Sequence, residues 1–124
     1  MKQICPTEQQ ECIAFVEWVR LQKKIGPYLI HIPNEGARSV RTGANLKRAG
    51  LLRGASDYFL AYPSDHYHGL FLEMKRTVKK LSRVSQCQLA FIEQMKEAGY
   101  HGDVVYGFDQ ARELVQRYLN NEKF

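Results

Sequence analysis

The sequence predicts an α/β fold in which a mixed four-stranded sheet is flanked by helices. Two observations support this prediction. Segments with apolar residues at helical spacing alternate with short β-prone runs, in the order α-β-α-β-β-α-β-α. The chain has 124 residues, 44% of them hydrophobic, which suits one domain over residues 1–124, because two cores of this size would each bury too little surface.

Four helices are predicted from apolar periodicity and from the residues at their ends. The first covers residues 7–24, where a Thr-x-x-Gln capping-box pattern precedes the apolar stripe, and Gly-Pro follows it. The second covers the basic residues 37–49, although a glycine weakens that prediction. The third covers residues 85–98 and stops at a glycine, and the last begins with Asp109 as its expected cap.

Four short strands are predicted at residues 28–32, 57–62, 69–75 and 104–106. Between the second and third, residues 63–65 read Pro-Ser-Asp, a combination typical of turns. We therefore expect the second and third strands to form an antiparallel hairpin.

Composition and cysteine content exclude several classes of protein. No apolar run approaches the ~18 residues that a membrane-spanning helix needs, so we expect no membrane association. The first ten residues lack the apolar stretch of a secretory signal, which favours a cytoplasmic location. The three cysteines are scattered and fit neither a disulfide framework nor a zinc site.

Positive charge is concentrated in the middle of the chain. Residues 38–83 contain ten Lys and Arg but only three Asp and Glu, whereas the whole chain has a net charge of +5. Such a concentration favours a polyanionic partner, most often a nucleic acid. A solvated basic surface without a partner explains the charge alone equally well.

Two carboxylates and an ammonium group lie on the predicted hairpin. Asp57 begins the first hairpin strand, Glu73 lies near the end of the second, and both are equidistant from Asp65 in the turn. Opposed antiparallel residues have Cβ atoms about 4.5–5.5 Å apart, and two such carboxylates repel each other unless a cation lies between them. Lys75 projects from the same face as Glu73, whereas Met74 points into the core.

This constellation predicts a divalent metal ion held by Asp57 and Glu73 with Lys75 beside it. A metal ion that polarises a phosphate, together with a lysine that stabilises developing negative charge, suits phosphodiester hydrolysis. An exposed strand with alternating charge would explain Glu73 and Lys75 if Asp57 were not at the matching register.

Two further residues are candidates for the same site. Glu35 lies in a turn after the first strand, where it could also be an ordinary polar turn residue. Gln88 lies in the first turn of the third helix, where Ser85-x-x-Gln88 forms a capping-box pattern. We expect the capping role to compete with donation of a hydrogen bond into the site.

Four motifs in a fixed order resemble the VRR-NUC domain, a branch of the PD-(D/E)XK nuclease superfamily with a restriction-endonuclease-like core. The matching residues are Pro33-Asn34-Glu35-Gly36, Gly54-Ala55-Ser56-Asp57, Glu73-Met74-Lys75 and Ser85-x-x-Gln88. The resemblance extends over about residues 7–120 and looks like the stand-alone form of phages and bacteria. Many relatives have a proline where this chain has Ser56, which removes no functional group.

The resemblance implies a DNA endonuclease that depends on Mg²⁺ or Mn²⁺. It assigns Glu35, Asp57 and Glu73 to the metal site, and Lys75 and Gln88 to catalysis. Glu8 in the first helix is either a further acidic residue near the metal or a carboxylate favoured by the helix dipole.

The resemblance also implies a homodimer that cuts branched DNA such as a Holliday junction, because cutting both strands needs two sites. Nicked, flapped or single-stranded DNA is an alternative substrate, and a non-catalytic DNA-binding module is an alternative function. Basic residues on both sides of the site are expected to contact phosphates, which positions DNA without reading its bases. They are Arg38, Arg41, Lys47, Arg48, Arg53, Arg76, Lys79, Lys80 and Arg83.

Overall fold

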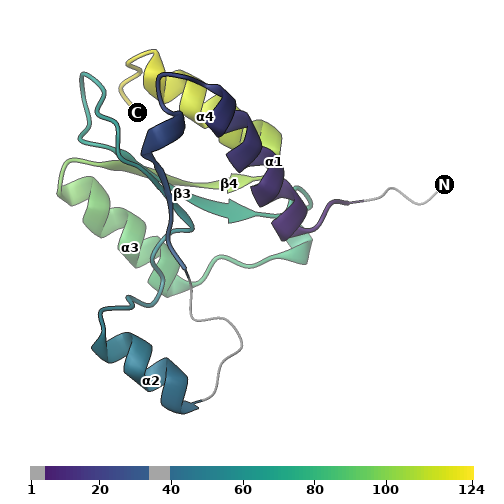
Figure 1. Cartoon of the computed structure of the whole chain (residues 1–124), viewed down its shortest axis with the longest axis vertical. Coiled ribbons are helices and arrows are strands. Elements are labelled where there is room, and N and C mark those ends of the chain that lie inside the picture. The colour runs from purple at the N-terminus through teal and green to yellow at the C-terminus, as the bar shows by residue number, and fades with distance from the viewer. Residues whose placement is uncertain (1–4, 34–39) are drawn as a thin grey trace.

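The structure is a computed structural model that describes residues 5–33 and 40–124. Helices and strands follow one another in the predicted order (Figure 1). The helices are α1 (Glu8–Leu21), α2 (Val40–Arg48), α3 (Gln86–Glu97) and α4 (Phe108–Leu119), and the strands are β1 (Leu29–His31), β2 (Tyr58–Leu60), β3 (Leu70–Lys75) and β4 (His101–Tyr106). Among these described helices, none is long and apolar enough to cross a membrane.

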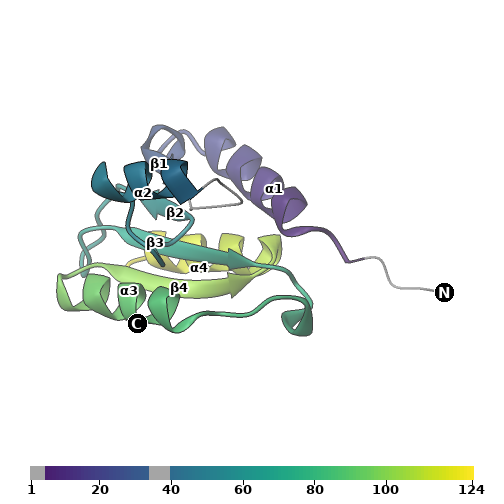
Figure 2. The same cartoon turned by 90° about the horizontal axis from the view of Figure 1, so that it is seen from below.

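The strands form one mixed sheet in the order β1-β2-β3-β4. The first three are antiparallel to their neighbours, and β4 runs parallel to β3. Helices α1 and α4 lie together on one face of the sheet, and α3 lies on the other (Figures 1 and 2). This arrangement confirms the predicted fold class.

The hairpin register agrees with the register expected from a turn centred on Asp65. Tyr58 lies opposite Leu72, and Leu60 lies opposite Leu70. One further step along the same register brings Asp57 level with Glu73. The alternation of side chains places Glu73 on the face that α3 covers, where it contacts Gln88, whereas Asp57, just before β2, also borders α1.

Both faces of the sheet are packed, which explains why every residue of β3 is buried. On the α1 and α4 side, Phe15, Leu72, Met74 and Val115 belong to the larger apolar core. On the α3 side the apolar cluster is smaller and is centred on Phe71. Because β3 is an inner strand with both faces covered, its charged residues are buried together with its apolar ones.

The prediction that Asp109 caps the last helix is wrong. The N-cap of α4 is Gly107, which has φ = 89° and no side chain to offer. The carboxylate of Glu11, on α1, accepts hydrogen bonds from the Phe108 N–H at 2.5 Å and from the Thr77 hydroxyl at 2.9 Å. A helix distant in sequence therefore supplies the cap, and Asp109 lies one residue inside the first turn.

Other boundaries differ from prediction by a few residues. Helix α1 ends at Leu21, and a 3₁₀ turn over Gly26–Tyr28 leads into β1. Strand β4 begins at His101, three residues earlier than predicted. The capping box of Thr7 and Gln10 is present as predicted. Helix α2 stands apart from the sheet, at the bottom of Figure 1.

Candidate active site

Asp57, Glu73 and Lys75 meet where β2 begins and β3 ends. Asp57 directly precedes β2, and Glu73 and Lys75 alternate with the core residue Met74 along β3. Their exposed fractions are only 7%, 2% and 7%, so three ionisable groups are removed from water together. Buried charges of this kind are rare unless they are paired or bind a ligand.

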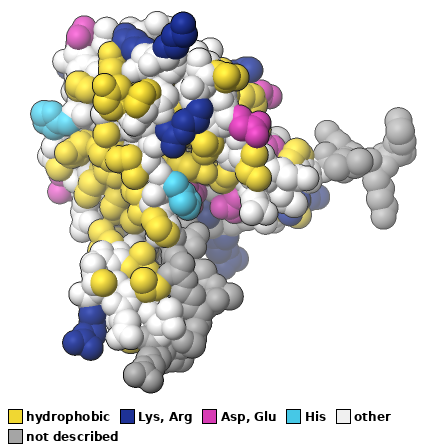
Figure 3. All heavy atoms as spheres, in the orientation of Figure 1, with side chains coloured by type: hydrophobic (Ala, Val, Ile, Leu, Met, Phe, Trp, Pro, Cys, Tyr) yellow, Lys and Arg dark blue, Asp and Glu magenta, His cyan; other side chains and the backbone are white. Residues whose placement is uncertain are grey.

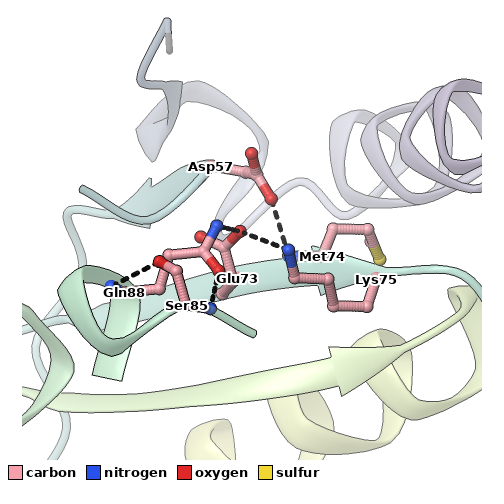
Figure 4. A network of polar contacts seen from close by, with 6 residues as sticks. All are labelled: Asp57, Glu73, Met74, Lys75, Ser85 and Gln88. Carbon is pink, nitrogen blue, oxygen red and sulfur yellow. Dashed lines mark hydrogen bonds and ion pairs between the residues drawn. The ribbon is translucent and has the colours of Figure 1, made fainter. Parts of the chain in front are cut away.

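Glu73 is held through one of its two oxygens. Its Oε1 accepts a hydrogen bond from Gln88 Nε2 at 2.7 Å and lies 3.6 Å from Lys75 Nζ (Figure 4). Its Oε2 is buried and has no hydrogen-bond partner among the described residues. An orphaned carboxylate oxygen in such a position is suited to a ligand supplied from outside the chain.

The expected competition between two roles of Gln88 is wrong, because the side-chain amide performs both. Its Oε1 accepts from the Ser85 N–H at 2.9 Å, which completes the capping box at the start of α3. Its Nε2 is left to donate to Glu73 (Figure 4). A glutamine carries an acceptor and two donors, so one oxygen can cap the helix while the nitrogen serves the site.

Asp57 is anchored across the hairpin. Its Oδ2 accepts a hydrogen bond from the Met74 N–H at 2.7 Å, the residue between Glu73 and Lys75 (Figure 4). The carbonyl oxygen of Asp57 accepts from the Ile32 N–H at 2.8 Å. The Met74 N–H therefore orients the Asp57 carboxylate, and the Ile32 N–H holds the Asp57 backbone in place.

Burial dominates the electrostatics of the two carboxyl groups. Burial and, next, the negative charge of Asp57 raise the pKa of Glu73 to about 8, while the positive charge of Lys75 opposes the shift. Burial also raises the pKa of Asp57, against the Met74 N–H and the Lys75 charge, which lower it. Two adjacent carboxylates thus resist ionisation together unless positive charge is added between them.

The donor set fits a hard divalent cation. Mg²⁺ and Mn²⁺ prefer oxygen ligands, and the buried Glu73 Oε2 beside Asp57 offers them. Across residues 5–33 and 40–124, no group of three or more His, Cys, Asp or Glu side chains is placed to hold a metal ion. Asp57 and Glu73 thus form a pair, and Glu35, the third predicted ligand, lies outside the described residues.

Two further residues lie beside Asp57: Glu8, for which a place near the metal was one of two expected roles, and His31, which the sequence did not indicate. Glu8 on α1 and His31 on β1 line the same groove as Asp57. Burial raises the pKa of Glu8, and so does the charge of Asp57. His31 Nδ1 lies 3.0 Å from the carbonyl oxygen of Asp57, which can only accept, so Nδ1 carries the proton in this contact. The sequence placed His31 in the first strand but gave no indication that it contacts Asp57.

The predicted phosphate-binding residues are distributed around the site unequally. Lys79, Lys80 and Arg83 are exposed on the segment that joins Lys75 to α3. Lys47, Arg48 and Arg53 are exposed on and after α2. Arg38 lies outside the described residues, and Arg41 is described only as part of the α2 backbone.

Arg76 has a structural partner that the sequence did not indicate. Its guanidinium donates to the carbonyl oxygens of Cys5 and Pro6, at 3.2 Å each. The side chain thus holds the segment before α1 against the end of β3. Phosphate contact by Arg76 would compete with these hydrogen bonds.

No protein-family model and no curated protein matches this sequence. Among solved structures, one described as a VRR_NUC domain protein aligns with 100% of this chain and 95% of its own chain. The two share 26% sequence identity and superpose with a TM-score of 0.82. The chain is therefore similar over its whole length to a VRR_NUC domain protein, and its sheet and flanking helices form the restriction-endonuclease-like core that the sequence predicted.

Proposed function

We propose that the protein is a metal-dependent DNA endonuclease that hydrolyses phosphodiester bonds. The observation that carries the proposal is the buried Glu73 carboxylate, with one oxygen held by Gln88 and the other without a partner among the described residues, next to Asp57. The fold of a VRR-NUC domain supports a nuclease of this type.

Each residue of the site has a distinct role in this proposal. Asp57 and Glu73 would hold Mg²⁺ or Mn²⁺, with Glu35 as a third ligand. When bound, the metal ion supplies Lewis acidity toward a phosphate oxygen and lowers the pKa of a bound water. Lys75, only 7% exposed, stabilises the negative charge that develops on the phosphate. Gln88 keeps Glu73 oriented through its 2.7 Å hydrogen bond.

The proposed substrate is branched DNA, with a Holliday junction as the leading candidate. Exposed Lys79, Lys80 and Arg83 lie on the segment that joins Lys75 to α3 and suit phosphate contacts, which position a duplex without reading its sequence. A symmetric homodimer would place two such sites on one junction, as paired cutting requires. Nicked, flapped or single-stranded DNA remains the alternative substrate class.

The test is cleavage of labelled four-way junctions, flaps and linear duplexes with Mn²⁺, with Mg²⁺ and with EDTA. Asp57→Asn keeps an acceptor for the Met74 N–H but removes the charge, so we expect folded protein with cleavage reduced at least ~100-fold. Asp65→Asn, at an exposed position in the hairpin loop, is the matched control and should cleave normally. Full activity in EDTA or in Asp57→Asn would overturn the proposal.

DNA binding without cleavage in any metal would indicate a binding module on the same fold. Light scattering of the wild-type protein with and without junction DNA tests the dimer separately. A monomer under both conditions would contradict paired cutting and favour the flap or nick alternative.

A further inference from the structure

A groove of about 610 Å³ starts at Asp57 and runs along α1. One wall consists of α1 residues from Glu8 to Glu17, a distance of about 13 Å at the rise of an α-helix. The other wall is His31 and Tyr58, whose ring centroids lie 5.2 Å apart. We call this feature the α1 groove; its volume lies within the range of pockets that bind small organic ligands.

The walls of the α1 groove are apolar along their length. Cys12, Ile13 and Val16 face it from α1, and Ile13 is 51% exposed. Tyr58 is anchored from below by Phe15, with ring centroids 5.5 Å apart in an edge-to-face arrangement. An exposed apolar side chain next to two aromatic rings is suited to contact with a flat, apolar face.

The charges of the α1 groove are unsuited to a phosphate backbone. Among the residues that the structure describes, those that line the groove include Glu8, Glu17 and Asp57 but no Lys or Arg. Figure 3 shows acidic side chains over α1 with hydrophobic side chains between them. A phosphate would be repelled here, whereas a neutral ring that carries amino groups could donate hydrogen bonds to Glu17 or to the Gln9 amide at the rim.

We propose that the α1 groove receives an unpaired nucleobase of the DNA, next to the phosphate that is cut. A base is flat, uncharged and rimmed by donors and acceptors, which matches the apolar walls and the acidic rim. Its sugar-phosphate backbone would stay at the mouth of the groove, near Asp57. A base stacked and paired within a duplex cannot enter, so the groove selects DNA that is unpaired or unstacked at the cut, as at a flap or a branch point.

This inference rests on the proposed nuclease function and adds the local structure of its substrate. The test uses flap substrates with either thymine or a base-free residue at each position around the cut. Removing the base that enters the groove should lower kcat/KM about 5- to 150-fold, the range for loss of one stacked base. Removing the other bases should have little effect.

The matched variants are Ile13→Asn, in the α1 groove, and Leu21→Asn, on the same helix at 79% exposure and outside it. We expect Ile13→Asn to lower kcat/KM on the thymine substrate. On the base-free substrate the variant should have no further effect, because removing the base has already abolished its contact with Ile13. Leu21→Asn should keep the full discrimination. Thermal melts of both variants check that each is folded.

Several results would overturn the inference. Wild-type protein that treats thymine and base-free substrates alike would do so, as would equal losses on both substrates in Ile13→Asn. A steeper salt dependence of binding in Glu17→Gln would indicate that phosphates enter the groove instead. If wild-type protein cleaves no DNA, the nuclease proposal fails. The groove is then tested by the change in fluorescence of 2-aminopurine placed in the flap when the protein binds. A signal on binding that Ile13→Asn abolishes supports the groove, and an unchanged signal refutes it.

Discussion

Gln88 links the start of α3 to the carboxylate of Glu73. Its Oε1 accepts from the Ser85 N–H at 2.9 Å, and its Nε2 donates to Glu73 Oε1 at 2.7 Å. The capping box therefore fixes the orientation of a residue in the candidate active site. The stability of the α3 N-terminus and the geometry of the site both depend on the side-chain amide of Gln88.

We predict that Gln88→Ala and Ser85→Ala differ in activity although both weaken the same cap. Each should lower the free energy of unfolding by about 1 kcal/mol, the usual value of a helix cap. Only Gln88→Ala removes the donor to Glu73, so its kcat/KM should fall at least ~10-fold below that of Ser85→Ala. Urea unfolding and cleavage assays measure the two effects, and equal activity in both variants would contradict a positioning role.

The metal-free protein should become less stable as pH rises. The pKa of Glu73 is raised from 4.5 to about 8 by burial and by Asp57, so the folded state retains a proton that the unfolded state releases. The free energy of unfolding then decreases from about pH 4.5 to about pH 8, by at most ~1.4 kcal/mol per pH unit from this group. Urea unfolding in EDTA should show this slope.

Glu73→Gln is the control for that pH dependence. The variant cannot titrate at this position, so its stability should vary less with pH over the same interval. Identical profiles for the wild-type protein and Glu73→Gln would show that the carboxyl group titrates normally in the folded state.

Glu11 should stabilise the fold without taking part in cleavage. Its carboxylate accepts from the Phe108 N–H and the Thr77 hydroxyl, so Glu11→Ala leaves the N-terminus of α4 without its cap. We expect a loss of about 1–3 kcal/mol in the free energy of unfolding. Glu17→Ala, exposed on the same helix, should change stability by less than ~0.5 kcal/mol. Equal effects of the two variants in urea unfolding would contradict the cap.

The segment after β3 should contribute to DNA binding through charge. Replacing both Lys79 and Lys80 by Ala should weaken binding and lower the slope of log K against log salt by about one unit per lost phosphate contact. Lys23→Ala with Lys24→Ala, in the turn after α1, removes the same charge far from Glu8 and should leave the slope closer to that of the wild-type protein. An unchanged slope in the Lys79 and Lys80 variant would show that this segment does not contact DNA.

Local patterns in the sequence were sufficient for most of the fold. Helical spacing, capping boxes and turn residues report on neighbours within a few positions, and they predicted the element order and the hairpin that aligns Asp57 with Glu73. They also placed Lys75 beside Glu73 and Met74 in the core, because side chains alternate along a strand. Glu35 lies outside the described residues, so its place in the site stays a prediction.

Contacts between distant segments were decided only by the tertiary structure. Glu11 capping α4, Arg76 holding the backbone of Cys5 and Pro6, and Glu8 sharing a groove with Asp57 join residues that no local pattern relates. Gln88 makes one contact of each kind. Its capping contact with Ser85 was predictable from the local sequence motif, but its hydrogen bond to Glu73 was established only by the structure. Periodicity reports which face of an element a residue occupies, and only packing of the elements determines what that face meets.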